Sequence, residues 1–221
     1  MAPPETKEHW MTAQALMELF TQKAQLVSAV VAPAKTFDEA LAYAVDICDR
    51  KQACQLLVSG CELPVSDTAQ ALCETKQQKV VAAPGLDATH FSALKKRCAD
   101  KGLACVDSSL RDHIAGIDVG IAVAGRGIAE TGTCVVVSDN EDVRLASMLC
   151  EVQVIILPVS ALAPTAFDIE AWMEERMAAP PSYLAFITGA SRTADIERVL
   201  AIGVHGPLEL HIVLWEDAAN D

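Results

Sequence analysis

Helical patterns and short apolar runs alternate along most of this 221-residue chain, and this alternation limits the folds open to it. Helical patterns at 38–50, 66–77 and 87–101 are each followed by an apolar run of strand length, at 54–60, 79–85 and 103–108. Consecutive alternations of this kind predict βαβ units. A parallel sheet with helices on both faces is therefore the expected framework.

The same pattern returns in the second half of the chain after one interruption. Residues 117–138 have the alternation and the glycines of two strands joined by a bend. Helices are then expected at 141–149, 168–178 and 193–202, and strands at 152–160, 182–189 and 208–215. We therefore expect residues 37–221 to form one layered α/β domain with a mostly parallel sheet.

An apolar stripe precedes this domain. Between residues 8 and 31, apolar side chains recur at intervals of three and four, which predicts one helix that ends before Pro33. The stripe consists of Trp10, Ala13, Met17, Phe20, Ala24, Val27 and Val31. Two interpretations are open for this N-terminal helical arm, residues 1–36: the stripe packs on its own domain, or it docks on a partner or a second copy.

Composition excludes several classes of partner. With 17 basic and 30 acidic residues, the chain has a formal net charge of −13 and would repel a nucleic-acid backbone or an anionic membrane. No apolar stretch approaches the roughly 18 residues that a membrane span needs, and the first residues lack a signal-peptide pattern. We expect a cytoplasmic protein.

Eight cysteines raise the question of a metal site. They are Cys48, Cys54, Cys61, Cys73, Cys98, Cys105, Cys134 and Cys150. No two of them are separated by only two residues, and none lies at zinc-finger spacing from a histidine. Reduced, buried thiols are the prediction, with no metal or cofactor bound by this chain.

A first candidate site follows an expected strand. The segment GRGIAETG, residues 125–132, begins like a dinucleotide fingerprint, but Glu130 occupies the third glycine position and a strand follows, so a nicotinamide site is not expected. A carboxylate between strand-like runs must be paired, neutralised or hydrated. Glu130 is therefore a candidate base, nucleophile or ligand anchor, or it caps the bend through the amides of Thr131 and Thr133.

A second candidate site is TGASRTADIE, residues 188–197. Here a strand is expected to end at Gly189 and a helix to begin at Thr193, at the carboxyl edge of the sheet, where α/β folds place ligands. The loop amides, the Ser191 hydroxyl and the Arg192 guanidinium would then hold a carboxylate or phosphate. Alternatively, Arg192 pairs with Asp195 and the loop is structural.

A third segment, GVHGP at 203–207, places His205 in a turn before a strand. In such a turn a histidine titrates near neutral pH and is available as an acid, base or ligand, or it is incidental.

Taken together and in this order, these segments carry a family resemblance. IAETGT at 128–133, Arg144 in VRLASML, TGASRTADIE and GVHGP resemble the LUD-domain family and, within it, the lactate utilisation protein C subgroup. The first motif matches Glu130, Thr131, Gly132 and Thr133; the second matches Ser191, Arg192, Thr193 and Asp195; the third matches His205 and Gly206. The resemblance implies a fold similar to the sugar-phosphate isomerase and CoA-transferase superfamily.

The resemblance also implies a function. Such proteins are subunits of a system that oxidises L-lactate to pyruvate with two partners, one rich in iron–sulfur cysteine motifs and one with a cysteine-rich redox domain. The chain itself lacks complete flavin, nicotinamide or cluster motifs, which favours an accessory subunit that binds a small anion through residues 131–133, Gly189 and the second motif. Two alternatives remain: an independent CoA-transferase-like or sugar-phosphate-acting enzyme that uses Glu130, with His205 as a second catalytic candidate, or a small-anion sensor.

Overall fold

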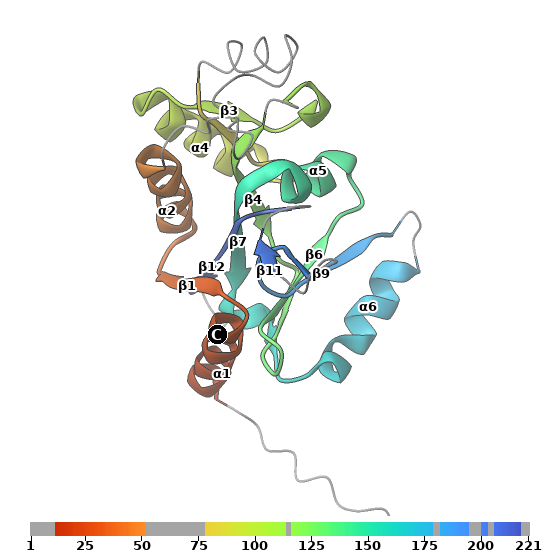
Figure 1. Ribbon diagram of the computed structural model, residues 1–221. Coiled ribbons are helices and arrows are strands. Elements are labelled where there is room, and N and C mark those ends of the chain that lie inside the picture. The colour runs from red at the N-terminus through yellow and green to blue at the C-terminus, as the bar shows by residue number, and fades with distance from the viewer. Residues whose placement is uncertain are drawn as a thin grey trace, which may run out of the picture.

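A six-stranded parallel sheet forms the centre of the computed structural model (Figure 1). The strand order is β1-β12-β7-β4-β2-β3, and each neighbouring pair is parallel. The strands are Ala29–Ala34 (β1), Val80–Ala82 (β2), Ala104–Val106 (β3), Ile117–Val123 (β4), Cys150–Pro158 (β7) and Glu209–Trp215 (β12). This confirms the parallel sheet predicted from the alternation.

The structure describes residues 12–51, 78–113, 116–178, 182–194, 200–202 and 206–217. The strand expected at 54–60 and the helix expected at 66–77 lie outside these ranges. None of the described helices is long and apolar enough to cross a membrane.

Helices α2 (Phe37–Arg50) and α4 (Ala88–Asp100) cover one face of this sheet (Figure 1). Each begins at a side-chain cap: Thr36 Oγ1 accepts from the Glu39 amide, and Asp87 Oδ1 accepts from the amides of Thr89 and His90. Their apolar sides bury Leu41, Ala44 and Leu94 against alternate side chains of the central strands. The prediction of helices at 38–50 and 87–101 is thus confirmed.

A second sheet, together with helices α1 and α5, covers the opposite face. Its four strands have the order β8-β5-β6-β9. They are Arg126–Ile128 (β5), Thr133–Val137 (β6), Leu162–Ala163 (β8) and Leu184–Ile187 (β9). Strand β6 pairs antiparallel with β5 and β9, while β5 and β8 are parallel. The two strands expected over 117–138 are therefore three, and the strand expected at 182–189 belongs to this second sheet.

Helices α5 (Glu141–Leu149) and α6 (Glu170–Met177) lie where the sequence predicted them. The Asn140 side chain caps α5 by accepting from the Asp142 amide. A short 3-10 helix, Ala166–Ile169, leads directly into α6. Together these two segments account for the helix expected at 168–178.

The N-terminal helix is shorter than predicted. Helix α1 runs over Ala13–Leu26, the chain turns at Ser28, which has a φ of 64°, and β1 follows. The prediction of a helix as far as Val31 was wrong, because Val31 and Pro33 belong to edge strand β1, where a proline removes no ladder hydrogen bond from the sheet interior. Phe20 and Ala24 are fully buried, so the described part of the stripe packs on its own domain.

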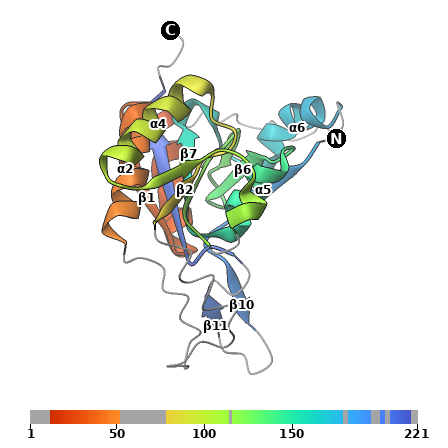
Figure 2. The ribbon, with the colours of Figure 1, turned by 90° about the horizontal axis from the view of Figure 1, so that it is seen from above.

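The helix expected at 193–202 is also wrong. Arg192–Ala194 (β10) and Leu200–Ile202 (β11) form an antiparallel ribbon that projects from the layers (Figure 2). Ile196, Val199 and Leu200 have helical spacing, but the run Val199–Ile202 fits a strand equally well. The helix N-terminus on which the anion site was predicted is therefore absent from the described residues of this segment.

Two glycines let α1 approach the second sheet closely. Gly132 (φ +66°) precedes β6, and a Cβ on it would lie 2.3 Å from the Ala24 backbone nitrogen. Gly189 (φ +80°) follows β9, and a Cβ on it would lie 2.4 Å from the Val27 carbonyl oxygen. Both backbone angles favour glycine. The end of α1 is thus in direct contact with two turns of the second layer.

Replacing Gly132 by alanine tests this contact. We expect G132A to lower the free energy of unfolding by about 3 kcal/mol, the sum of left-handed strain and overpacking. Gly102→Ala is the matched control, because Gly102 has a φ of +69° and nothing within 4 Å of its Cβ position. G102A should lose only about 1 kcal/mol in urea unfolding. Equal losses in the two variants would show that the α1 contact contributes nothing.

Candidate functional site

A cavity of about 260 Å³ opens where the end of β9, the start of β12 and helix α5 meet. We call it the β9 cavity. It is lined by Ser147, Gln153, Ala185, Phe186, Ile187, Thr188, Gly189, Ala190, Ser191, Gly206, Pro207 and Leu210. None of these side chains carries a charge. The described lining is therefore uncharged and mixes apolar side chains with the neutral polar groups of Ser147, Gln153, Thr188 and Ser191.

Backbone contacts bring the second and third sequence motifs together at this cavity. The Ser191 amide donates to the Pro207 carbonyl oxygen over 3.1 Å. Gly206 lies so close that a Cβ on it would be 3.1 Å from the Ser191 Cβ. The Leu208 amide in turn donates to the Glu151 carbonyl oxygen over 2.8 Å, which fixes this wall to strand β7.

A chain of hydroxyl groups connects the first motif to the same cavity. Thr131 Oγ1 lies 2.7 Å from Thr133 Oγ1, which lies 2.7 Å from Thr188 Oγ1. Thr133 is buried at the start of β6, and Thr188 lines the cavity after β9. All three segments that the sequence singled out are therefore linked, although only the second and third form the cavity wall.

Gln153 and Leu210 form the floor of the cavity from neighbouring strands. They are register partners on β7 and β12. The Gln153 side chain is almost fully buried, with 3% of its surface exposed, and its Nε2 has no hydrogen-bond partner among the described residues. Buried amides nearly always have such a partner, so this group identifies the cavity as a candidate binding site.

The first-motif residues have structural contacts of their own. Glu130 is exposed, does not line the β9 cavity, and accepts a hydrogen bond from the Ala166 amide over 3.0 Å at the start of the 3-10 helix. The Glu130 carboxylate is thus bonded to the amide of Ala166, a residue distant in sequence, instead of to the predicted Thr131 and Thr133 amides. Gly132 serves the packing of α1.

Of the predicted second-motif residues, Gly189 and Ser191 line the cavity. Arg192 and Thr193 belong to β10 instead of a helix start, and Asp195 lies outside the described residues, as does His205. The cavity also differs in place from the prediction. It lies over the first halves of β7 and β12, because β9 belongs to the second sheet instead of ending at the carboxyl edge of the parallel sheet.

Sequence reasoning missed Gln153, Ser147 and Thr188. A signal for Gln153 was present: it is the single amide in the apolar run VQVIILP. On β7 it shares a face with Ile155 and Leu157, which are fully buried under the second layer. A polar residue at such a position needs a partner.

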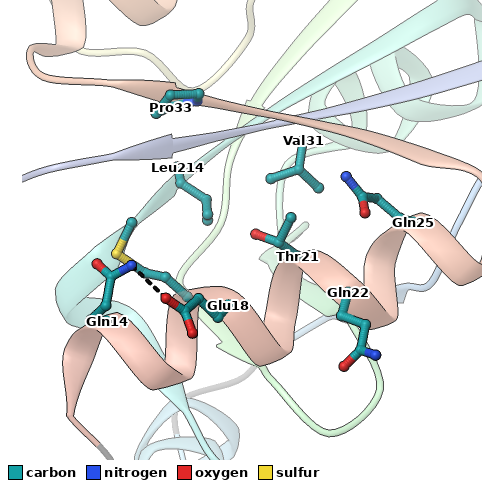
Figure 3. Close-up of a pocket in the computed structure, with 9 residues that line it drawn as sticks. Gln14, Glu18, Thr21, Gln22, Gln25, Val31, Pro33 and Leu214 are labelled. Atoms are coloured by element: carbon teal, nitrogen blue, oxygen red, sulfur yellow. Dashed lines mark hydrogen bonds between the residues drawn. The ribbon is translucent and has the colours of Figure 1, made fainter.

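A second depression, about 390 Å³ in volume, lies between α1 and strands β1 and β12 (Figure 3). Its polar residues, which include Gln14, Glu18 and Gln22, lie on the exposed side of α1, and Gln14 donates to Glu18 over 2.8 Å. Val31 and Leu214 form its apolar base. Water satisfies exposed amides of this kind, so this groove is a weaker candidate than the β9 cavity.

The described cysteines are free thiols. Cys48, Cys98, Cys134 and Cys150 are buried, and Cys105 is partly buried. Burial raises the pKa of Cys48 and of Cys150 to about 12, so both remain protonated at neutral pH. Within the described ranges no three His, Cys, Asp or Glu side chains are grouped so that they could hold a metal ion.

Comparison with solved structures supports the fold. A DUF162 family protein from Deinococcus radiodurans is similar over 93% of this chain and 99% of its own, with a TM-score of 0.54 and 15% sequence identity. At this identity the likeness concerns the fold alone.

Comparison of sequences identifies relatives. Proteins named lactate utilization protein C are 38% identical over 103 residues in Geobacillus thermodenitrificans (45% of this chain, 43% of the relative) and 34% identical over 103 residues in Bacillus subtilis (45% and 43%). The protein of that name in Macrococcus caseolyticus is 33% identical over 137 residues (55% and 59%). This chain spans about half the length of the curated relatives it matches. The LUD domain model matches residues 17–215, which include the central sheet, the second layer and the β9 cavity, and the chain therefore belongs to the LUD domain family.

Proposed function

We propose that this protein is a subunit of an L-lactate utilisation system, that it works with iron–sulfur partner proteins, and that it binds a small polar ligand in the β9 cavity. The proposal rests on one observation: the second and third motifs meet around one cavity, which is lined by Gln153, and the Gln153 amide nitrogen has no partner among the described residues. The choice of lactate utilisation as the system is supported by the relatives named lactate utilization protein C.

The chemistry of lactate oxidation divides the work between subunits. Conversion of lactate to pyruvate removes two electrons and two protons, and amino-acid side chains do not store an electron pair without a cofactor or metal. In the proposal, iron–sulfur clusters of the partners accept the electrons. The buried Cys48 and Cys150 remain protonated thiols, which suits packing better than cluster ligation.

If the partner subunits accept the electrons, lactate oxidation by this chain depends on their presence. Dye-coupled oxidation of L-lactate should be absent with the purified chain and appear when the chain is co-expressed with both partner proteins. Omitting the chain from that mixture should lower the rate at least tenfold. Turnover by the chain alone would contradict the proposal, and an unchanged rate in its absence would favour a small-anion sensor.

A second experiment addresses the alternative of an independent enzyme that uses Glu130. Because Glu130 Oε1 accepts from the Ala166 amide, Glu130→Gln keeps the acceptor and removes only the charge. We expect E130Q to retain lactate oxidation in the complete system, and Glu130→Ala to lower the free energy of unfolding by about 1 kcal/mol, as the loss of a helix cap does. A folded E130Q protein without activity would instead make Glu130 catalytic.

A further inference from the structure

The position of Gln153 is unfavourable for a polar side chain. Its register neighbours on the flanking strands are Leu210 and Gly120, and the next residues along the same face of β7, Ile155 and Leu157, are fully buried. An amide nitrogen with no partner among the described residues lowers the stability of the fold in such surroundings, whereas an apolar side chain of similar shape would not. A group that destabilises the folded protein in this way is typical of a binding site.

The other polar groups of the cavity are hydroxyls. Ser147 Oγ donates to the Arg144 carbonyl oxygen over 2.8 Å, so its lone pairs remain as acceptors. Thr188 Oγ1 belongs to the threonine chain, and Ser191 lines the cavity beside Gly206. With the amide, these groups provide both donors and acceptors within one small volume.

Size and charge narrow the ligand class. A volume of about 260 Å³ is below the range of about 300–1,000 Å³ that drug-sized ligands occupy. Because none of the described lining residues is cationic, these residues offer no counter-charge to a doubly charged phosphate that loses its hydration. A single carboxylate needs only N–H and O–H donors and leaves part of its surface at the open mouth.

We propose that Gln153 is the recognition group of a binding site for a small hydroxycarboxylate. In this proposal the Gln153 amide turns about its last side-chain bond, so that the N–H, which is buried in the structure, donates to a carboxylate oxygen. The amide carbonyl accepts from the ligand hydroxyl, and the short carbon skeleton lies against Leu210 and Phe186. The choice of L-lactate as the first probe rests on the proposed function; the site itself rests on the cavity.

The test is titration of the isolated, full-length chain with four probes, followed by calorimetry and by the side-chain amide resonances of Gln153 in NMR spectra. L-Lactate should bind and shift these resonances. Acetate, which lacks the hydroxyl, lactamide, which lacks the charge, and inorganic phosphate should each bind at least tenfold more weakly. Phosphate as the tightest ligand, or a Gln153 resonance that does not move, would overturn the proposal.

Gln153→Met is the decisive variant, because it keeps the volume and removes both hydrogen-bonding groups. It should weaken L-lactate binding at least tenfold and leave the unfolding temperature unchanged or higher. Gln22→Met, on the exposed side of α1, should alter neither property. A Q153M protein that binds L-lactate normally, or that unfolds several degrees lower, would show that the amide has a structural role.

Ser191→Ala provides a second variant in the lining of the cavity. It should weaken L-lactate binding several-fold with folding intact, and unchanged affinity would count against the site. Failure of this inference can be distinguished from failure of the proposed function. A chain that supports partner-dependent oxidation without binding L-lactate itself overturns only this inference.

Discussion

The close packing of the second layer on the parallel sheet determines the rest of this structure. Helix α1 contacts the turns at Gly132 and Gly189 through backbone atoms, and small side chains such as Ala122 and Ala124 lie beneath the second sheet. Such contacts exclude side chains larger than a hydrogen or a methyl group, so the layers are held at one distance. The β9 cavity opens where this packing ends, along β9 and the turn that follows it.

This origin explains the composition of the cavity. Residues of the parallel sheet form its floor, the turns after β9 and before β12 form two of its walls, and α5 forms another. The first motif is far from the other two in sequence, yet the threonine chain joins it to them. The Ser191 to Pro207 hydrogen bond joins the second motif to the third. A ligand there would contact elements of both layers and would therefore stabilise the association between them.

The sequence predicted the framework better than the site. Helices 87–101 and 141–149 and strands 152–160 and 208–215 were found because each buries one continuous face of the parallel sheet or packs on it. The second sheet was not predicted, since alternation within a strand does not specify which sheet the strand joins. The helix prediction at 193–202 was wrong for a related reason. The apolar spacing of this segment fits both the helical and the strand periodicity, and the antiparallel pairing of β10 with β11 decides between them. Gln153 was overlooked because the neighbours that surround its side chain come from β4, β12 and the second layer, which are distant in sequence.

A crystal structure of the protein with saturating L-lactate would show whether Gln153 binds this ligand. We expect density for the carboxylate in the β9 cavity, with one oxygen within about 3 Å of the Gln153 amide nitrogen. We also expect unchanged packing of α1 on the turns at Gly132 and Gly189. A cavity that holds only water on Gln153, or a Gln153 amide bonded to a protein group with the cavity closed, would contradict this expectation.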